Sequence, residues 1–417
     1  MTGRGKRLFW IAAAFGILLR VGLFLLAGKD AALRLYAPDS FDYQQLAVNL
    51  LAGHGFSRDS HPPFAPDVLR TPTYPAFLVT LYFLFGPSPS VGVLAGVLLS
   101  CASIFLARRA ARAWVPGRSA GNLAGAFIAL DLGAAAYANF LLTESLFVVL
   151  LLIAFDLFGR AIREGRGRDA LFCGLLLGLA MLCRPIALGL PLFSLLARNW
   201  RASRFVLLGS AIVVMPWVAR NALTVGLLDV SSVGAVNLLY HRASAVEDAR
   251  MGRPHETAAT PADASDRAAV ARMRRRGWDI LRGNAGLYAR LTLSAWLRTF
   301  GPDEDPLFQL LGLPADPSPW WLTRRQASHQ PRAPSLAENL VEGALLLALS
   351  AGVILGLRAF RDPVWRPMLL AASAVVVYFL IVSGPEYYGR FRVPILPFLA
   401  LIADAGTARP TLSAEIP

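Results

Sequence analysis

The feature that most constrains this chain is a series of apolar runs, most of them close to the length of a bilayer crossing. A helix needs about 20 apolar residues to cross the hydrocarbon layer. We place ten candidate spans at residues 8–28, 91–108, 119–138, 142–160, 169–183, 185–199, 204–219, 336–357, 367–383 and 393–407. The chain is therefore predicted to be an all-α polytopic membrane protein, with residues 1–417 forming a single membrane-embedded domain.

The composition agrees with this class. Hydrophobic residues make up 55% of the chain and charged residues 16%, with a mean hydropathy of +0.50, whereas soluble domains carry about 25% charged residues. An ordinary cytosolic enzyme is excluded on these values. The net charge of +14 comes from bases at the edges of the apolar runs, so the expected partner is the lipid bilayer and not nucleic acid. The three cysteines show no metal-site spacing.

Arginines indicate how the spans are oriented. Four short connections hold most of those near span ends: Arg108, Arg109, Arg112 and Arg118; Arg160, Arg163, Arg166 and Arg168; Arg198, Arg201 and Arg204; and Arg358, Arg361 and Arg366. With both chain ends inside, ten spans place all four connections on the cytoplasmic side, as the positive-inside rule requires. Two long segments, residues 29–90 and 220–335, then face outward and contain all five histidines. We expect a bacterial plasma-membrane protein whose chemistry lies on the extracytoplasmic face.

Both outer segments contain amphipathic patterns. Pro38, Asp39 and Ser40 open a predicted helix with an apolar stripe, which Gly53 is placed to end. Prolines then hold an irregular stretch up to residue 75. A second amphipathic stretch is predicted over residues 262–299, following a linker at residues 257–266.

Each acidic side chain at an outer span end has two alternative interpretations. Asp39 and Asp42 either cap the first outer helix or supply a carboxylate for acid–base chemistry at the membrane surface. Glu144, after Thr143, either compensates a helix dipole or belongs to a site. Arg20, inside the first span, is either paired or functional, or extends its side chain to the interface.

Arginines also collect at the outer ends. Arg184, Arg220, Arg390 and Arg392 lie near span ends on this side. Each alone is explained as an interface anchor, and together they suit a lipid-linked phosphate, because guanidinium groups bind phosphate oxygens in pairs.

Seven segments together carry a family resemblance. They are residues 38–43 (PDSFDY), 46–57 (LAVNLLAGHGFS), 70–77 (RTPTYPAF), 142–147 (LTESLF), 178–185 (GLAMLCRP), 216–221 (PWVARN) and 389–394 (GRFRVP). In this order they resemble the polyprenyl-phosphate-sugar-dependent glycosyltransferases of family 39, which include protein O-mannosyltransferases and lipid A aminoarabinose transferases. The resemblance spans roughly residues 8–405 and is thin between 240 and 335.

The resemblance implies a GT-C fold and assigns roles to individual residues. Asp39 matches the family's first-loop catalytic acid, with Asp42 and Glu144 as further catalytic candidates. Ser40 follows Asp39 where many relatives have a second acid. The resemblance implies a substrate cavity lined by Tyr43, Tyr74 and His54. The implied donor-phosphate ligands are Arg70, Arg184, Arg220, Arg390 and Arg392.

A divalent metal ion is the one candidate cofactor. Glu144 matches an acidic residue that binds metal in some relatives, and His241 falls in the region that supplies a metal-binding histidine there.

The expected activity is inverting transfer of a hexose or pentose from a polyprenyl-phosphate carrier to a lipid, glycan or protein acceptor. Two other functions fit a polytopic chain: a transporter or flippase for lipid-linked sugars, and an oligosaccharide polymerase or ligase. A transporter would place polar groups and helix breaks at mid-membrane, and a polymerase would not predict the Pro-Asp-Ser segment.

Overall fold

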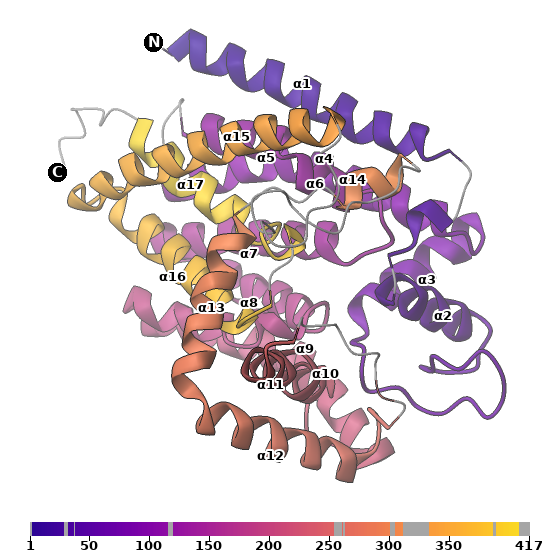
Figure 1. Cartoon of the computed structure of the whole chain (residues 1–417). Coiled ribbons are helices and arrows are strands. Elements are labelled where there is room, and N and C mark those ends of the chain that lie inside the picture. Colours follow the sequence, from indigo (N-terminus) through magenta and orange to yellow (C-terminus); the bar gives the residue numbers. More distant parts are fainter. Residues whose placement is uncertain are drawn as a thin grey trace.

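The computed structural model describes residues 2–28, 32–36, 38–115, 120–253, 261, 263–300, 305–311, 333–386 and 389–407. All regular structure within these ranges is helical (Figure 1). The predicted all-α class is therefore confirmed. Half of the linker at 257–266, and residues 312–332 of the second outer segment, lie outside the described residues.

Six helices in the described ranges are long and apolar enough to cross a membrane. They are α1 (Thr2–Leu26), α4 (Pro89–Trp114), α7 (Glu144–Glu164), α9 (Trp200–Val225), α15 (Ala333–Leu357) and α16 (Arg366–Ser383). α1 exposes Ile11, Leu18 and Leu25 on its outer side. Large apolar side chains exposed along such helices suit contact with lipid, so the chain has the form of a multi-pass membrane protein.

The other four predicted spans form shorter or interrupted helices. They are α5 (Asn122–Leu130) with α6 (Leu132–Tyr137), α8 (Gly167–Met181), two 3₁₀ segments (Pro185–Ala187 and Leu190–Ala197), and α17 (Leu396–Thr407). Prolines explain two of the differences, because each removes a backbone donor and fixes φ. Pro185 and Pro191 lie at the starts of the two 3₁₀ segments, while Pro394 precedes α17.

Asp131 and Arg20 explain the break between α5 and α6. The Asp131 side chain accepts a hydrogen bond from Ala134 N and caps α6. The Arg20 guanidinium donates to the carbonyl oxygens of Ile128 (2.8 Å) and Ala129 (2.9 Å) at the end of α5. Arg20 is fully buried, so the alternative in which its side chain reaches the interface is wrong.

The first outer segment contains two helices joined by an irregular stretch. α2 (Asp39–Leu51) matches the predicted amphipathic helix and buries Tyr43, Leu46 and Ala47. Gly53 follows it with φ of 81°, a conformation that favours glycine. α3 (Thr73–Phe85), which the proline pattern did not predict, packs against α2.

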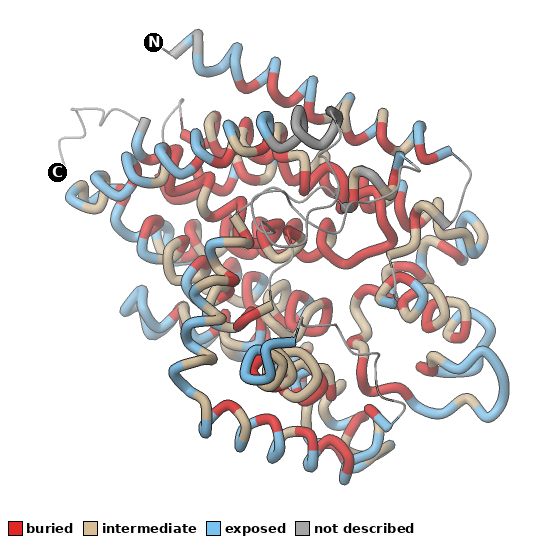
Figure 2. The backbone as a smooth tube through the Cα atoms, in the orientation of Figure 1, coloured by how far each residue is buried: buried red, intermediate tan, exposed pale blue. Residues whose placement is uncertain are grey.

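The second outer segment also follows its amphipathic pattern. α12 (Arg267–Gly283) buries Ala269, Val270 and Met273, and α13 (Ala285–Thr299) continues after Asn284. Figure 2 shows buried and exposed residues alternating along α12, with the exposed ones directed away from the molecule. Its inner face packs against a π-helix at Asn237–Ala243.

α7 runs from the end of the bundle that holds Glu144 toward the end that holds the arginine-rich connections. It packs between α4 and α8 and begins at Glu144. Asp156, twelve residues along the same helix, pairs with Arg109 near the end of α4 and with Arg160 of α7, next to two of the arginine-rich connections. At 1.5 Å per residue, about 18 Å of helix axis separates Glu144 from Asp156. The arginine-rich connections therefore lie far along the bundle from Glu144.

Candidate functional site

Eight charged side chains form one continuous ladder in which cations and carboxylates alternate. In order they are Arg184, Glu144, Arg390, Asp39, Arg70, Asp42, Arg58 and Asp67. Four guanidinium groups and four carboxylates give this ladder a formal net charge of zero. Its members come from segments more than 300 residues apart in sequence, so the fold itself assembles the ladder.

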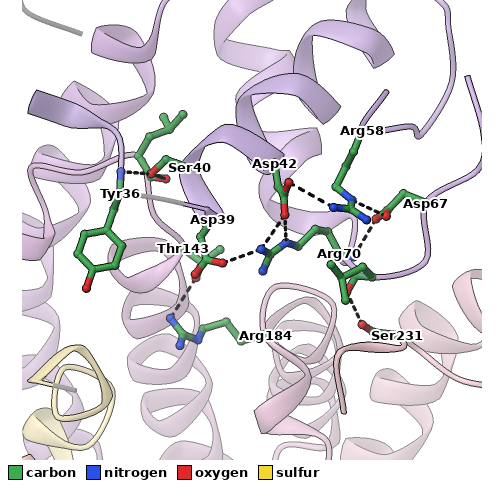
Figure 3. A network of polar contacts seen from close by, with 12 residues as sticks. Tyr36, Asp39, Ser40, Asp42, Arg58, Asp67, Arg70, Thr143, Arg184 and Ser231 are labelled. Atoms are coloured by element: carbon green, nitrogen blue, oxygen red, sulfur yellow. Dashed lines mark hydrogen bonds and ion pairs between the residues drawn. The ribbon is translucent and has the colours of Figure 1, made fainter. Parts of the chain in front are cut away.

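The centre of the ladder is Asp39, which two arginines hold from opposite sides. One carboxylate oxygen of Asp39 lies 2.6 Å from Arg70 Nη2, and the other lies 2.7 Å from Arg390 Nη1. Figure 3 shows Asp39 and Asp42 on the same helix facing Arg70. Asp39 and Asp42 are three residues apart on α2, which places both carboxylates on one face.

Each central arginine is also held by a second carboxylate. Arg70 Nε lies 2.9 Å from Asp42 Oδ2, with Nη2 2.7 Å from the same oxygen. Arg390 Nε lies 2.8 Å from Glu144 Oε1. Arg390 uses separate nitrogens for its two carboxylates, whereas Arg70 Nη2 is shared between Asp39 and Asp42. Two carboxylates therefore fix the orientation of each arginine.

The two ends of the ladder are anchored in the protein. Arg184 pairs with Glu144 and donates to Thr143 Oγ1 at 3.1 Å. At the other end, Arg58 Nε lies 2.6 Å from Asp67 Oδ1 and Nη1 lies 3.4 Å from Asp42. Asp67 and Glu144 are buried, whereas the side chains between them keep 11–24% exposure. The middle of the ladder is thus reachable from outside.

Local backbone contacts set the position of Asp39. Ser40 Oγ accepts from Tyr36 N at 2.8 Å and donates to the Leu141 carbonyl at 2.9 Å (Figure 3). These bonds tie the start of α2 to the segment just before α7. Ser40, in the place of the second acid of many relatives, therefore joins the Asp39 region to the Glu144 region.

No side-chain cap forms at the start of α2 or at the start of α7. α2 begins after Pro38, and no side-chain capping bond is formed there. Thr143 likewise makes no side-chain capping bond at α7; its hydroxyl instead accepts from Arg184. The capping reading of Asp39 is wrong, and its carboxylate is directed into the ladder.

Two opposing effects set the ionisation of the central groups. Burial alone would raise the pKa of Asp39, but the guanidinium groups of Arg390 and Arg70 outweigh it and hold that pKa well below its usual range. Burial would lower the pKa of Arg70, yet Asp39, Tyr43 and Asp42 raise it. Asp39 is therefore a carboxylate, and Arg70 a cation, at any physiological pH.

Two of the three predicted cavity residues lie beside the ladder. Tyr43 packs edge-on against Tyr74 with ring centroids 5.0 Å apart, and the Arg70 guanidinium lies 5.3 Å from the Tyr43 ring. Burial raises the pKa of Tyr43 to about 12, so this phenol stays neutral. His54 is exposed and stacks on Phe64; its ring contact is with the irregular stretch and not with the ladder.

Two of the predicted phosphate ligands, Arg392 and Arg220, lie outside the ladder. Arg392 is buried with 1% exposure and pairs with Glu342 of α15 and with Asp131 at 3.5 Å. The interior carboxylates neutralise its charge, so Arg392 is a structural cation. Arg220 donates to the Asp67 carbonyl at 2.7 Å and lies 4.8 Å from the Trp217 ring. It supports the end of the ladder and has no ion pair with its carboxylates in the described structure.

The metal prediction does not fit the donor set. Within the described ranges, no group of three or more His, Cys, Asp and Glu side chains is placed to hold a metal ion. Glu144 already pairs with two guanidinium groups, which would repel a divalent cation. His241 lies in the π-helix at Asn237–Ala243.

Sequence reasoning missed Arg58 and Asp67. Both lie in the irregular stretch between α2 and α3, where no periodicity assigns a side to a residue. The sequence feature that could have indicated them is their position on either side of the prolines that precede Arg70.

Comparison with known proteins agrees with this architecture. Residues 63–221 match the family described as dolichyl-phosphate-mannose-protein mannosyltransferase. This range contains Asp67, Arg70, Glu144 and Arg184 of the ladder. A search of curated proteins gave no sequence match.

Solved structures give the wider likeness. The archaeal oligosaccharyltransferase AglB from Archaeoglobus fulgidus, in complex with an inhibitory peptide and a dolichol-phosphate, aligns at 17% identity and a TM-score of 0.52. Its apo form aligns at 15% and 0.54. Both alignments cover 96% of this chain and 50% of the other, so this chain corresponds to about half the length of the relative.

ArnT from Cupriavidus metallidurans, bound to undecaprenyl phosphate, aligns at 14% identity and a TM-score of 0.41, covering 94% of this chain and 77% of that one. The fold is thus that of the GT-C membrane glycosyltransferases, and residues 63–221 carry the sequence pattern of the dolichyl-phosphate-mannose-protein mannosyltransferase family.

Proposed function

We propose that this protein is an integral membrane glycosyltransferase that moves a sugar from a polyprenyl-phosphate carrier to an acceptor on the extracytoplasmic face. The acceptor is a lipid, a glycan or a protein, and transfer inverts the anomeric centre. The observation that carries the proposal is the Asp39 carboxylate held between Arg70 and Arg390. The match to a mannosyltransferase family that uses a lipid-phosphate donor supports it.

The ladder supplies a base for the acceptor and cations for the departing phosphate. An acceptor hydroxyl or amine attacks the anomeric carbon of the sugar, and the bond from that carbon to the phosphate oxygen breaks. The electron pair leaves with the polyprenyl phosphate, whose charge Arg70, Arg390 and Arg184 stabilise. The acceptor proton passes to Asp39, which orients the nucleophile. A single displacement of this kind inverts the anomeric configuration.

The proposal is tested by a transfer assay in membranes with radiolabelled polyprenyl-phosphate sugars as donors. The wild type is compared with Asp39→Asn, which keeps the shape of the side chain and removes its charge. We expect free polyprenyl phosphate from the wild type and a loss of about 100-fold or more in the variant, the range typical of a positioned base.

Asp229→Asn is the matched control. Asp229 pairs with Arg274 and lies outside the ladder, so this variant should keep wild-type activity. Full activity in a correctly inserted Asp39→Asn protein would contradict the role of Asp39. Movement of intact lipid-linked sugar across the bilayer, without release of polyprenyl phosphate, would favour a transporter instead.

A further inference from the structure

We propose that Asp39 is an internal counter-anion. In the free protein it occupies the arginines that bind the donor phosphate, and the arriving phosphate displaces it. This inference rests on the proposed function and adds to it a reason why the carboxylate becomes available only when donor is bound.

The edges of the two guanidinium groups carry the first step. Arg70 and Arg390 each present an Nη atom to Asp39, at 2.6 and 2.7 Å. Their Nε atoms face other carboxylates, Asp42 and Glu144, and Arg70 Nη2 also lies 2.7 Å from Asp42. Removing Asp39 from between them therefore leaves both arginines anchored in orientation, with one Nη each directed into the vacated space. Two convergent guanidinium groups match the oxygens of a phosphate.

The charge of the ladder carries the second step. Four guanidinium groups and four carboxylates already balance, and the central side chains are only 11–16% exposed. A phosphate added beside an undisplaced Asp39 would bring an unbalanced anion within a few ångströms of a carboxylate, which is unfavourable in a poorly solvated site. Displacement of Asp39 gives its two ion pairs to the phosphate and moves the carboxylate away from the arriving anion.

The consequence links binding to chemistry. While Asp39 is held by two cations it is a weak base, because both cations favour its ionised form. Once phosphate takes those arginines, the carboxylate loses this stabilisation and can accept a proton from the acceptor. Donor binding thus prepares the base next to the bond that must break.

Microscale thermophoresis of the purified full-length protein measures its affinity for farnesyl phosphate, which would compete with Asp39 for the arginines. Farnesol is the uncharged control. Asp39→Asn should bind farnesyl phosphate about tenfold or more tightly than the wild type, because removal of one charge at this distance in a partly buried site is worth at least that factor. Asp39→Glu keeps the competing charge and should stay near wild type. Arg390→Gln should weaken binding about tenfold or more.

The control and the contrary results are specific. Asp229→Asn removes the same charge outside the ladder and should change affinity less than twofold. Equal or weaker binding by Asp39→Asn, in protein that elutes and melts as a folded species, overturns the exchange; Asp39→Ser replaces it if the Asn variant does not fold. Absence of farnesyl phosphate binding in the wild type overturns the proposed function itself, and the exchange with it.

Discussion

The role of general base proposed for Asp39 conflicts with its contacts in the free protein. A general base works best with a pKa near the working pH, whereas Arg390 and Arg70 hold the pKa of Asp39 well below its usual range. Other charged or titratable groups near it are Asp42, Glu144, Arg184 and Tyr43, and Tyr43 remains neutral. Loss of the contacts with Arg390 and Arg70 would make Asp39 a stronger base.

This conflict predicts different pH profiles for two kinetic constants. In the free protein Asp39 is ionised above its depressed pKa, so lowering the pH from 8 to 5 should leave kcat/KM without an acid limb from this group. In the donor complex the arginines hold phosphate, the pKa of Asp39 rises, and kcat should fall on the acid side at a higher pH than kcat/KM. Initial rates with a lipid-linked donor over this range measure both constants. Superimposable profiles would contradict the exchange of anions.

At the scale of residues, the sequence identified most, but not all, of the side chains in the ladder. Asp39, Asp42, Arg70, Glu144, Arg184 and Arg390 were predicted and are brought together. Arg390 and Arg392 are two residues apart, yet one enters the ladder and the other pairs with Glu342 and Asp131. A short irregular segment has no fixed periodicity, so spacing alone cannot tell which of two nearby arginines faces outward.

At the scale of elements, the α5–α6 break depends on one buried arginine. Arg20 donates to Ser100 Oγ and to the carbonyl oxygens of Ile128 and Ala129. Those two carbonyls end α5, where no continuing helix supplies donors. Arg20 is thus the residue that allows an apolar run to bend inside the bundle.

Arg20→Leu should destabilise the protein by at least ~2 kcal/mol, because each buried acceptor left without a donor costs about 1–3 kcal/mol. The measurement is thermal unfolding in detergent, followed by fluorescence-detected gel filtration. Arg7→Gln on the same helix is the control, since Arg7 is exposed and should change stability by no more than ~0.5 kcal/mol. An unchanged melting temperature for Arg20→Leu would mean that α5 ends without help from Arg20.

The same elements explain what hydropathy could and could not predict. Each of the ten apolar runs contains helix, but an apolar run has no signal for where its helix stops. Asp131, Pro185, Pro191 and Pro394 were the visible breakers. α3 was missed because Pro75 lies within its first turn, where proline is tolerated.

For the whole molecule, the separation of two kinds of charge matters most. The ladder lies at the start of α7, and the arginine-rich connections lie farther along the same helix and at its end. The positive-inside rule assigns such connections to the cytoplasm. We therefore expect the ladder to face the extracytoplasmic side, where the proposed lipid-linked donor needs no nucleotide sugar.

Single added cysteines test this orientation. Ser60 lies in the exposed stretch between α2 and α3. Arg168, which is 73% exposed, lies in the first turn of α8, just after the connection from α7. A membrane-impermeant maleimide applied to intact cells should label Ser60→Cys at once and Arg168→Cys only after permeabilisation. The parent protein is the control, because Cys173 and Cys183 are buried and Cys101 is half-buried. The reverse order of labelling would place the ladder in the cytoplasm, where a nucleotide-linked donor is accessible, and would require a different donor for the same arginines.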